Sequence, residues 1–451
     1  MSRGDSSRGE RAVSHAAPAL LTGAESASPD LKNRRLYALA VVVLAGMTAS
    51  VIFHYLAGGV FRWNHVSVSF LLSINGPLDQ LGGTFMDLTG PLKDARASLN
   101  GVPWLSPTPL FHVFYLSLLP LGTTGAVLLQ SAIFLAGLAL LVWSTFVDAL
   151  TSRPQRITYL LILCVLSYPV LFVLERGNIE MVLFVVMAGF LYLYYVKQSV
   201  WCVALLAIAI SLKMYPAVFL VLMLADRRYK WALSTVVCAA VITLGSIALL
   251  AAVLPGSLLD YIHISTSALR QINYVYVSGF WGLPYGHSLW GLVVSLAGLF
   301  GIDQTAFVGR ASFPYTITVL VVFAALAVFV IHFVRLQWQR VALLTIAALA
   351  LPTVSADYRL LYAYLPLAML LNSSVRTRVD TVCIVLLGCL LVPTDYVYGV
   401  VLRNTGWLRS TDWQLTHASV SVVVYPLVMC ALLAVISWDA LSGHRMGGRL
   451  D

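Results

Sequence analysis

The sequence contains few charged residues. They make up 10% of its 451 residues, whereas a soluble globular domain carries about 25%. Because a chain folded in water needs more charge than this to cover its surface, a soluble globular protein is excluded. The apolar content also excludes a disordered chain. The formal net charge of +9 does not indicate nucleic-acid binding, since so few charges contribute to it.

Motifs for metals and cofactors are also missing. The sequence has no DxD pair, no HExxH and no His/Cys cluster with metal-ligand spacing, so no metal site is predicted. It has no Walker loop and no GxGxxG at a helix start, so no nucleotide or other cofactor is predicted. The 6 cysteines lie in apolar runs without CxxC spacing, which is typical of buried thiols.

Long apolar runs are what the sequence has instead. Apolar residues make up 60% of the chain, and its mean hydropathy is +0.87. Runs of about 20 residues fit α-helices that cross a membrane, so the expected fold class is an all-α polytopic membrane protein. About twelve spans are predicted, at residues 36–56, 124–147, 157–174, 179–196, 199–212, 214–225, 231–254, 313–334, 341–354, 361–372, 379–393 and 418–438.

The predicted spans define a membrane domain, 36–438, between two cytoplasmic tails, 1–35 and 439–451. The first tail is rich in Ser, Ala and Gly, which predicts disorder. Apolar runs at 109–121 and 287–301 are expected to form juxtamembrane or re-entrant helices. Three long segments are expected on the outer side, at residues 57–123, 255–312 and 394–417.

The distribution of charge supports this orientation. The segments expected on the cytoplasmic side carry 18 of the 28 Lys and Arg residues and 9 of the 19 Asp and Glu residues. The whole net charge of +9 therefore lies on the cytoplasmic side, as the positive-inside rule requires. The basic surplus indicates topology in a cell membrane and not an acidic ligand.

Ionisable residues that topology does not explain are candidates for function, because charge at membrane depth is costly. Two such acids follow the first span. Asp87 stands in the apolar run 85–88, where restricted access of water would favour a general base. Asp94 is flanked by Lys93 and Arg96, which favour its charged form and make it a weaker base. Either acid could instead cap a helix or lie in a solvated loop.

Two further groups interrupt apolar helices on the same side. The turn 175–180 contains Arg176, Asn178 and Glu180. Arg176 or Asn178 could contact the phosphate or hydroxyl groups of a ligand, or the turn could hold an Arg–Glu pair that neutralises itself. Lys213, just before Tyr215, breaks a long apolar run. Its ammonium group could bind a phosphate or could extend to the membrane interface.

The last two groups lie at 287–288 and 357–359. Asp357 and Arg359 flank Tyr358, and the two charges could pair with each other or serve an anionic ligand. His287 and Ser288 open an apolar run, where they could bind a ligand or cap a helix.

In this order, the motifs resemble those of glycosyltransferase family 87, in the C-type membrane glycosyltransferase superfamily. The resemblance extends over about residues 36–440. At 89–91 this sequence reads Thr-Gly-Pro where many relatives have aromatic or polar residues, so either Asp87 or Asp94 fits as the reacting acid. The matching segments are 85–88, 101–104, 107–110, 175–180, 213–216, 287–289 and 357–360.

The resemblance implies an inverting transferase that moves a sugar from a polyprenyl-phosphate donor to a glycolipid or cell-envelope glycan. Mannose is the expected sugar, and the reaction is expected on the outer face of the plasma membrane. Besides these partners, only membrane lipids are expected, and no nucleic acid. Asp87 would be the catalytic base, and the residues expected to bind substrate are Asp94, Arg176, Asn178, Glu180, Lys213, Tyr215, His287, Ser288, Asp357, Tyr358 and Arg359.

Within that reading, Arg176, Lys213 and Arg359 would hold the departing phosphate. Three aromatic residues would either stack on sugar rings or anchor the protein at the membrane interface: Trp104, Tyr285 and Trp290.

Two other kinds of function remain open. A transporter or flippase of lipid-linked sugars would also place charges in a membrane cavity, but it should expose them at mid-membrane and on both sides. Here the unexplained charges all lie on one side, which favours an enzyme. An oligosaccharide ligase or polymerase would use the same class of polyprenyl-linked donor.

Overall fold

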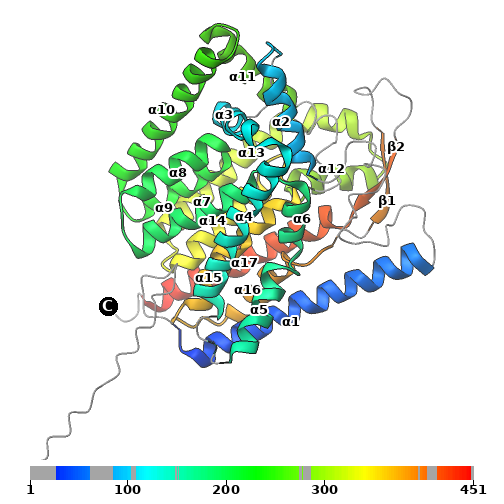
Figure 1. Cartoon of the computed structure of the whole chain (residues 1–451). Helices are drawn as coiled ribbons and strands as arrows, with labels where there is room; N and C mark the ends of the chain where they lie inside the picture. The colour runs from blue at the N-terminus through cyan, green and yellow to red at the C-terminus, as the bar shows by residue number, and fades with distance from the viewer. Residues whose placement is uncertain are drawn as a thin grey trace, which may run out of the picture.

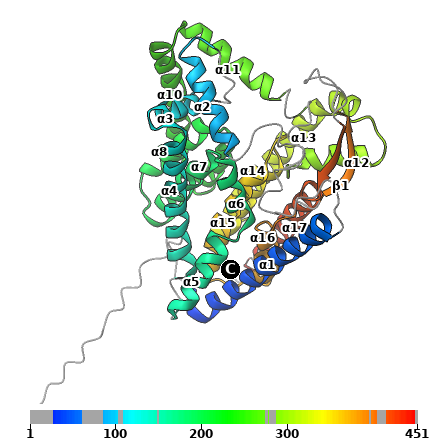
Figure 2. The same cartoon turned by 45° about the vertical axis from the view of Figure 1, so that its right-hand side comes forward.

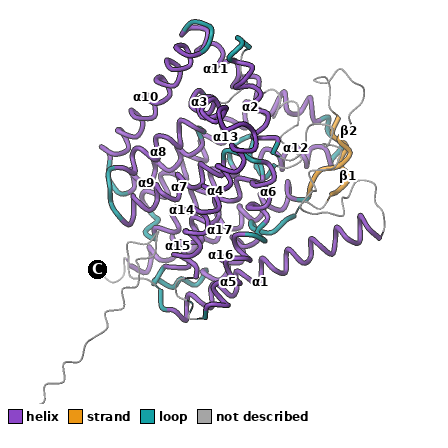
Figure 3. The backbone as a smooth tube through the Cα atoms, viewed as in Figure 1, coloured by secondary structure: helices purple, strands orange, loops and turns teal. Residues whose placement is uncertain are grey.

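The structure is a computed structural model that describes residues 27–60, 85–102, 108–147, 150, 152–273, 277, 286–394, 397–403 and 414–447. Within these residues the chain is predominantly helical (Figures 1 and 3), which confirms the helical class. The α-helices are α1 Pro29–His54, α2 Met86–Ser98, α3 Pro109–Leu118, α4 Gly122–Val142, α5 Arg153–Cys164, α6 Tyr168–Arg176, α7 Glu180–Leu191, α8 Trp201–Leu212, α9 Leu220–Ala225, α10 Tyr229–Val253, α11 Leu258–Asn273, α12 Leu289–Leu299, α13 Gln304–His332, α14 Gln337–Ala350, α15 Tyr364–Asn372, α16 Asp380–Cys389 and α17 Ser421–Gly447.

One element departs from the all-helical expectation. Strands β1 (Val397–Arg403) and β2 (Gln414–Ser419) pair antiparallel, with an irregular register between Gly399 and Leu402. Both strands belong to the segment expected as the outer loop 394–417, and they lie beside α12 (Figure 1). The hairpin was not predicted, because neither strand lies in an apolar run long enough to cross a membrane.

The chain is a membrane protein with several helices that suit the bilayer. Among the described residues, five helices are long and apolar enough to cross it, or six if the bent pair α5–α6 counts as one span. Shorter apolar helices include α8, α12 and α16, each of 10–17 residues. The number of twelve spans is not confirmed and stays a prediction. The five long candidates are Pro29–Ala57, Pro109–Thr145, Tyr229–Val253, Ala306–His332 and Ser421–Ser442.

The helix over Pro109–Thr145 has 37 residues. It is not one straight helix, because the 3₁₀ turn Leu119–Leu121 and the positive φ of Gly122 (+64°) separate α3 from α4. At 1.5 Å per residue, the 21 residues of α4 extend about 32 Å, enough to cross a hydrocarbon core of about 30 Å without α3. The juxtamembrane or re-entrant position of residues 109–121 stays a prediction.

Helix α1 begins earlier than the sequence predicted. Its N-cap is Ser28, and residues 29–35, expected to belong to a disordered tail, are helical. Arg35 is buried, where it pairs with Asp380 of α16 and donates to the carbonyl oxygens of Leu370 (2.9 Å) and Ser373 (2.7 Å). This residue of the basic cluster therefore ties α1 to the helices beside it. At the other end, α17 runs to Gly447, beyond the expected span.

The interior of the molecule contains helices α14 and α15. Residues 341–350 of α14 and all of α15 are buried, whereas α10 exposes apolar side chains such as Leu233 and Val241. Helices α1 and α10 lie on opposite sides of the molecule (Figures 1 and 2). This arrangement is consistent with contact between lipid and helices α1 and α10, and with helices α14 and α15 shielded from lipid.

The breaks between helices carry the predicted polar groups. Helices α5 and α6 meet at a bend of 55°, and α6 is followed by Gly177, which has a left-handed conformation. Helix α8 is followed by Lys213, which is extended. A 3₁₀ helix, Asp357–Ala363, precedes α15.

Candidate functional site

The start of α2 places Asp87 next to the end of α6. Phe85 has a left-handed conformation (φ 64°), and its N–H donates to the carbonyl oxygen of Glu175 (2.7 Å). The hydroxyl of Tyr115 in α3 donates to the backbone oxygen of Asp87 (3.2 Å). The backbone of Asp87 is therefore held from two sides.

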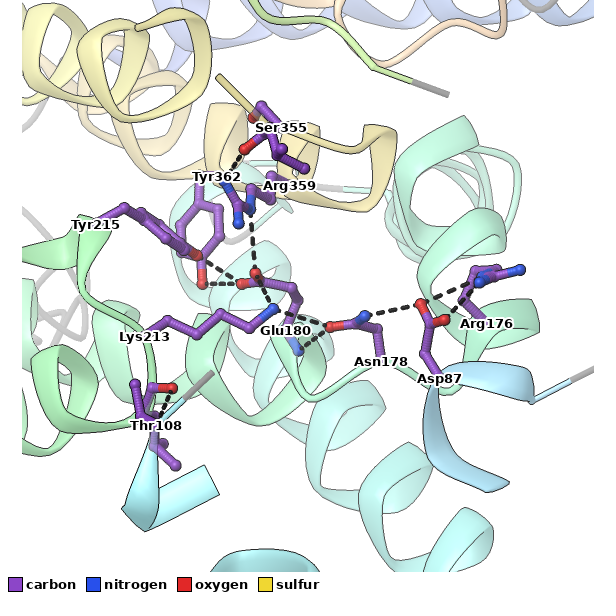
Figure 4. Close-up of polar contacts among 12 residues, drawn as sticks. Asp87, Thr108, Arg176, Asn178, Glu180, Lys213, Tyr215, Ser355, Arg359 and Tyr362 are labelled. Carbon is purple, nitrogen blue, oxygen red and sulfur yellow. Dashed lines mark hydrogen bonds and ion pairs between the residues drawn. The ribbon is translucent and has the colours of Figure 1, made fainter. Parts of the chain in front are cut away.

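The side chain of Asp87 is paired. Arg176 donates to both carboxylate oxygens, from Nη2 to Oδ1 and from Nε to Oδ2 (3.2 Å). Asn178 Nδ2 also donates to Oδ2 (2.8 Å), as Figure 4 shows. The prediction that Asp87 lies in an apolar setting is wrong, because the guanidinium of Arg176 and the amide of Asn178 contact its carboxylate. The sequence had left open whether Arg176 binds a ligand or pairs with a neighbouring Glu, and the structure pairs it with Asp87.

Asn178 connects Asp87 to a second carboxylate. Its Oδ1 accepts from the backbone N–H of Glu180 (3.0 Å) and from Lys213 Nζ (3.4 Å). With Oδ1 occupied by two donors, the amide nitrogen must face Asp87. Figure 4 shows Asn178 between Asp87 and Lys213.

Glu180, at the start of α7, is fully buried and has four partners. Lys213 Nζ donates to Oε1 (2.8 Å), and Arg359 Nε lies 3.4 Å from the same atom, an ion-pair distance. The hydroxyls of Tyr215 (2.6 Å) and Tyr362 (2.8 Å) donate to Oε2. We call Asn178, Glu180, Lys213, Tyr215, Arg359 and Tyr362 the Glu180 cluster.

Local structure explains why the two cations reach Glu180. Helix α8 ends at Leu212, whose carbonyl oxygen accepts from Thr108 Oγ1 (2.9 Å), and the extended Lys213 then leads into the 3₁₀ helix Tyr215–Phe219. The guanidinium of Arg359 lies over the ring of Tyr215 at 4.5 Å. A cation over an aromatic face is electrostatically favourable.

Asp357 and Arg359, expected as possible partners, face different groups. Asp357 is fully buried, with Oδ1 3.1 Å from Nδ1 of His287 and Oδ2 accepting from the hydroxyl of Tyr168 (2.9 Å). Ser355 Oγ lies 2.8 Å from Nε2 of His287. Burial lowers the pKa of His287 and raises the pKa of Asp357. Tyr358 stands between Asp357 and Arg359 in the sequence, and Lys213 Nζ lies 5.4 Å from the centre of its ring.

Ser288 acts as a helix cap. Its Oγ accepts from the N–H of Gly291 (3.0 Å) and donates to the carbonyl oxygen of Thr353 (3.1 Å). The capping alternative for Ser288 is therefore confirmed. Together with His287 it fastens the start of α12 to the segment before Asp357, and neither residue joins the Glu180 cluster.

Asp94 lies on the same helix as Asp87 and has no hydrogen bond or ion pair to the residues that the structure describes. Burial raises the pKa of Asp94, opposite to the effect expected from its basic neighbours. Trp104 and Tyr285 lie outside the described residues. Trp290 is buried against Phe307 and Tyr315, so it is a core residue and not a platform for a sugar.

Several contributing residues were not predicted: Tyr115, Tyr168, Ser355 and Tyr362. Each stands alone in an apolar or mixed segment, and no local pattern distinguishes its hydroxyl from that of any other interfacial side chain. No group of three or more His, Cys, Asp and Glu able to hold a metal ion occurs within the described ranges.

The helical membrane fold and a site of paired carboxylates and cations at helix breaks are the features of a membrane enzyme that handles a polar substrate. The family model described as glycosyltransferase family 87 matches residues 106–356, more than half of the chain. The chain belongs to this family and is a membrane glycosyltransferase. The match contains Arg176, Glu180 and Lys213, whereas Asp87 and Arg359 lie outside its limits. Neither a curated protein nor a solved structure matches the chain significantly.

Proposed function

We propose that the protein is an inverting glycosyltransferase that uses a polyprenyl-phosphate sugar, with mannose as the sugar. The acceptor is a glycolipid or a cell-envelope glycan, and the reaction takes place on the outer face of the plasma membrane. The protein crosses that membrane about twelve times. The observation that carries the proposal is the contact of Asp87, through Asn178, with a cluster that contains two cations.

Asp87 is the general base in this proposal. Each carboxylate oxygen has about two lone-pair positions. Oδ2 of Asp87 accepts from Arg176 and Asn178, whereas Oδ1 accepts only from Arg176 among the described residues. Oδ1 therefore keeps one position for the acceptor hydroxyl, and we assign it as the atom that takes the proton.

The reaction then proceeds by a single displacement. The acceptor oxygen forms a bond to the anomeric carbon, its proton passes to Asp87, and the bond from that carbon to the phosphate oxygen breaks. The polyprenyl phosphate leaves with increased negative charge, which Lys213 and Arg359 stabilise. Donors fixed in place where charge develops are an effective form of catalysis.

The decisive experiment is transfer by the purified protein. The wild-type protein in nanodiscs is incubated with radiolabelled polyprenyl-phosphate mannose and a membrane lipid extract. We expect labelled glycolipid from the wild-type protein and at most a trace from Asp87→Asn. Transfer from a nucleotide-mannose alone, without a lipid-linked intermediate, would contradict the proposed donor. Movement of the donor across the membrane of a vesicle, without transfer of its sugar, would instead favour a flippase.

A further inference from the structure

The carboxylate of Glu180 is enclosed by the protein and accepts three hydrogen bonds, from Lys213, Tyr215 and Tyr362. Oε2 accepts from Tyr215 and Tyr362, and Oε1 lies against Lys213 and Arg359. A carboxylate offers about four positions for a donor; the ion pair with Arg359 covers the fourth, and the side chain is 0% exposed. A sugar hydroxyl therefore cannot reach Glu180, and the direct contact with substrate predicted for Glu180 is replaced here by a different role.

The two cations that face Glu180 are less enclosed. The side chains of Lys213 and Arg359 are 11% and 14% exposed. Lys213 donates to Glu180 and Asn178, which uses two of its three N–H groups among the described residues. Arg359 donates from Nη1 to the carbonyl oxygen of Val354 (3.0 Å). Both cations thus keep donors for a ligand while their shared carboxylate stays hidden.

The charges of this trio do not cancel. Two cations face one carboxylate, 2 − 1, which leaves one unit of positive charge. Asp87 and Arg176 form a separate pair with no surplus. The trio therefore balances an anionic group with a single charge, and a phosphodiester has that charge, whereas a sugar diphosphate carries about two.

We infer that Glu180 is the resident counter-anion of the site: it positions Lys213 and Arg359 for a phosphate group and limits their surplus to the one charge of a phosphodiester. When the bond to the sugar breaks, the phosphodiester becomes a monoester with more negative charge. Glu180 then competes with it for the same cations, which promotes release of the product. The identity of the donor in this inference rests on the proposed function.

The test separates the charge of Glu180 from its geometry. Binding of farnesyl phosphate and the kcat and KM of mannose transfer are measured in nanodiscs, with farnesol as the uncharged ligand. Glu180→Gln removes the charge, so farnesyl phosphate should bind about tenfold more tightly, while farnesol binding stays unchanged. Its kcat should fall at least ~10-fold, because the two cations lose their anchor. Glu180→Asp keeps the charge but shortens the side chain, so kcat should fall while farnesyl phosphate binds as in the wild-type protein.

Asp226→Asn is the matched control. Asp226 is also held by an arginine and a tyrosine, Arg340 (2.5 Å) and Tyr194 (2.7 Å), and loss of its carboxylate should change neither phosphate binding nor kcat.

Unchanged or weaker binding of farnesyl phosphate to folded Glu180→Gln would overturn the inference. If that variant does not fold, Tyr362→Phe decides, since it removes one anchoring hydroxyl and no charge. Its kcat should fall with phosphate affinity unchanged, and a wild-type kcat would overturn the positioning role.

The two proposals can fail separately. If the wild-type protein transfers no mannose but Glu180→Gln still binds farnesyl phosphate more tightly, the proposed function fails and the counter-anion role stands. Normal transfer by the wild-type protein, with phosphate binding unchanged in Glu180→Gln, gives the opposite result.

Discussion

The carboxylate of Asp87 is held at both oxygens by the guanidinium of Arg176, which lies 89 positions further along the chain. This pair joins the first turn of α2 to the last turn of α6, and Asn178 extends it to the Glu180 cluster. The proposed base therefore has a fixed orientation before any substrate binds. Such preorganisation is a large part of what an active site contributes to catalysis.

Replacement of the proposed base should abolish most turnover. Asp87→Asn is nearly isosteric and removes the proton acceptor, so kcat should fall at least ~10²-fold. Binding of the donor should stay within a few-fold, because the phosphate contacts remain. Transfer and donor binding are to be measured in the same nanodisc preparation. Asp94→Asn, on the same helix, is the control and should lose far less activity; an inactive but folded Asp94→Asn beside an active Asp87→Asn would reverse the assignment.

Arg176 binds Asp87 through two donors of its planar guanidinium, one to each carboxylate oxygen. Arg176→Lys keeps the positive charge but cannot donate to both oxygens in the same planar geometry. We expect kcat to fall by about tenfold or more, since Asp87 loses its fixed orientation. The melting temperature should change little, because both side chains are about one-fifth exposed (19% and 21%). A wild-type kcat for Arg176→Lys would show that charge alone is sufficient.

Gly177 is required between α6 and α7 for two reasons. Its φ is +64°, and a Cβ there would lie 3.1 Å from Cβ of Leu88 and 3.2 Å from Cδ1 of Phe85. In Gly177→Ala the left-handed backbone should cost about 1–2 kcal/mol of stability, and the contact should displace the start of α2 together with Asp87. Gly301→Ala is the control, because its φ is +72° with nothing within 4 Å. Unfolding midpoints should fall in both variants, but transfer should fall only in Gly177→Ala.

Asp94 provides a test of stability against pH. Burial raises its pKa above the ordinary value of 3.8, so the folded protein binds this proton more tightly than the unfolded chain does. The stabilisation is then fully present below about pH 3.8 and is lost as the pH rises through the folded pKa. Asp94→Asn, which cannot ionise, should therefore melt at a higher temperature than the wild-type protein at pH 7, with the difference shrinking towards pH 4. A lower melting temperature for the variant at pH 7 would mean that the ionised carboxylate is stabilised by a partner.

Topology can be tested on either side of α10. This helix covers Tyr229–Val253 and is a candidate span, so residues just before and after it should lie on opposite sides of the membrane. A reporter active in the cytoplasm should give signal after Arg228 and at the C-terminus, and one active outside should give signal after Ser257. A silent reporter at any of these sites would contradict the predicted orientation.

The sequence alone determined the class of this protein and which residues deserved attention. Apolar runs of about 20 residues leave few alternatives to membrane helices. A charged residue that interrupts such a run has a high free-energy cost in the bilayer, so each one is a candidate for function. For this reason Asp87, Arg176, Lys213 and Arg359 could be selected without a structure. The family was recognised from the order of these motifs, and the family match confirms it.

The tertiary structure decided which charge meets which. The sequence left open whether Asp357 and Arg359, two residues apart, pair with each other or serve a ligand. In the structure Asp357 lies against His287, and Arg359 lies against Glu180. A contact between neighbours in the chain can be predicted from the sequence, whereas contacts across helix breaks depend on how α6, α8 and the 3₁₀ helix Asp357–Ala363 pack. The hydroxyl of Tyr362 reaches Glu180 across 182 positions, and no local pattern encodes a contact of that kind. Burial also reversed the effect expected at Asp94, because the loss of water around a carboxyl group depends on the whole fold and not on its neighbours in sequence.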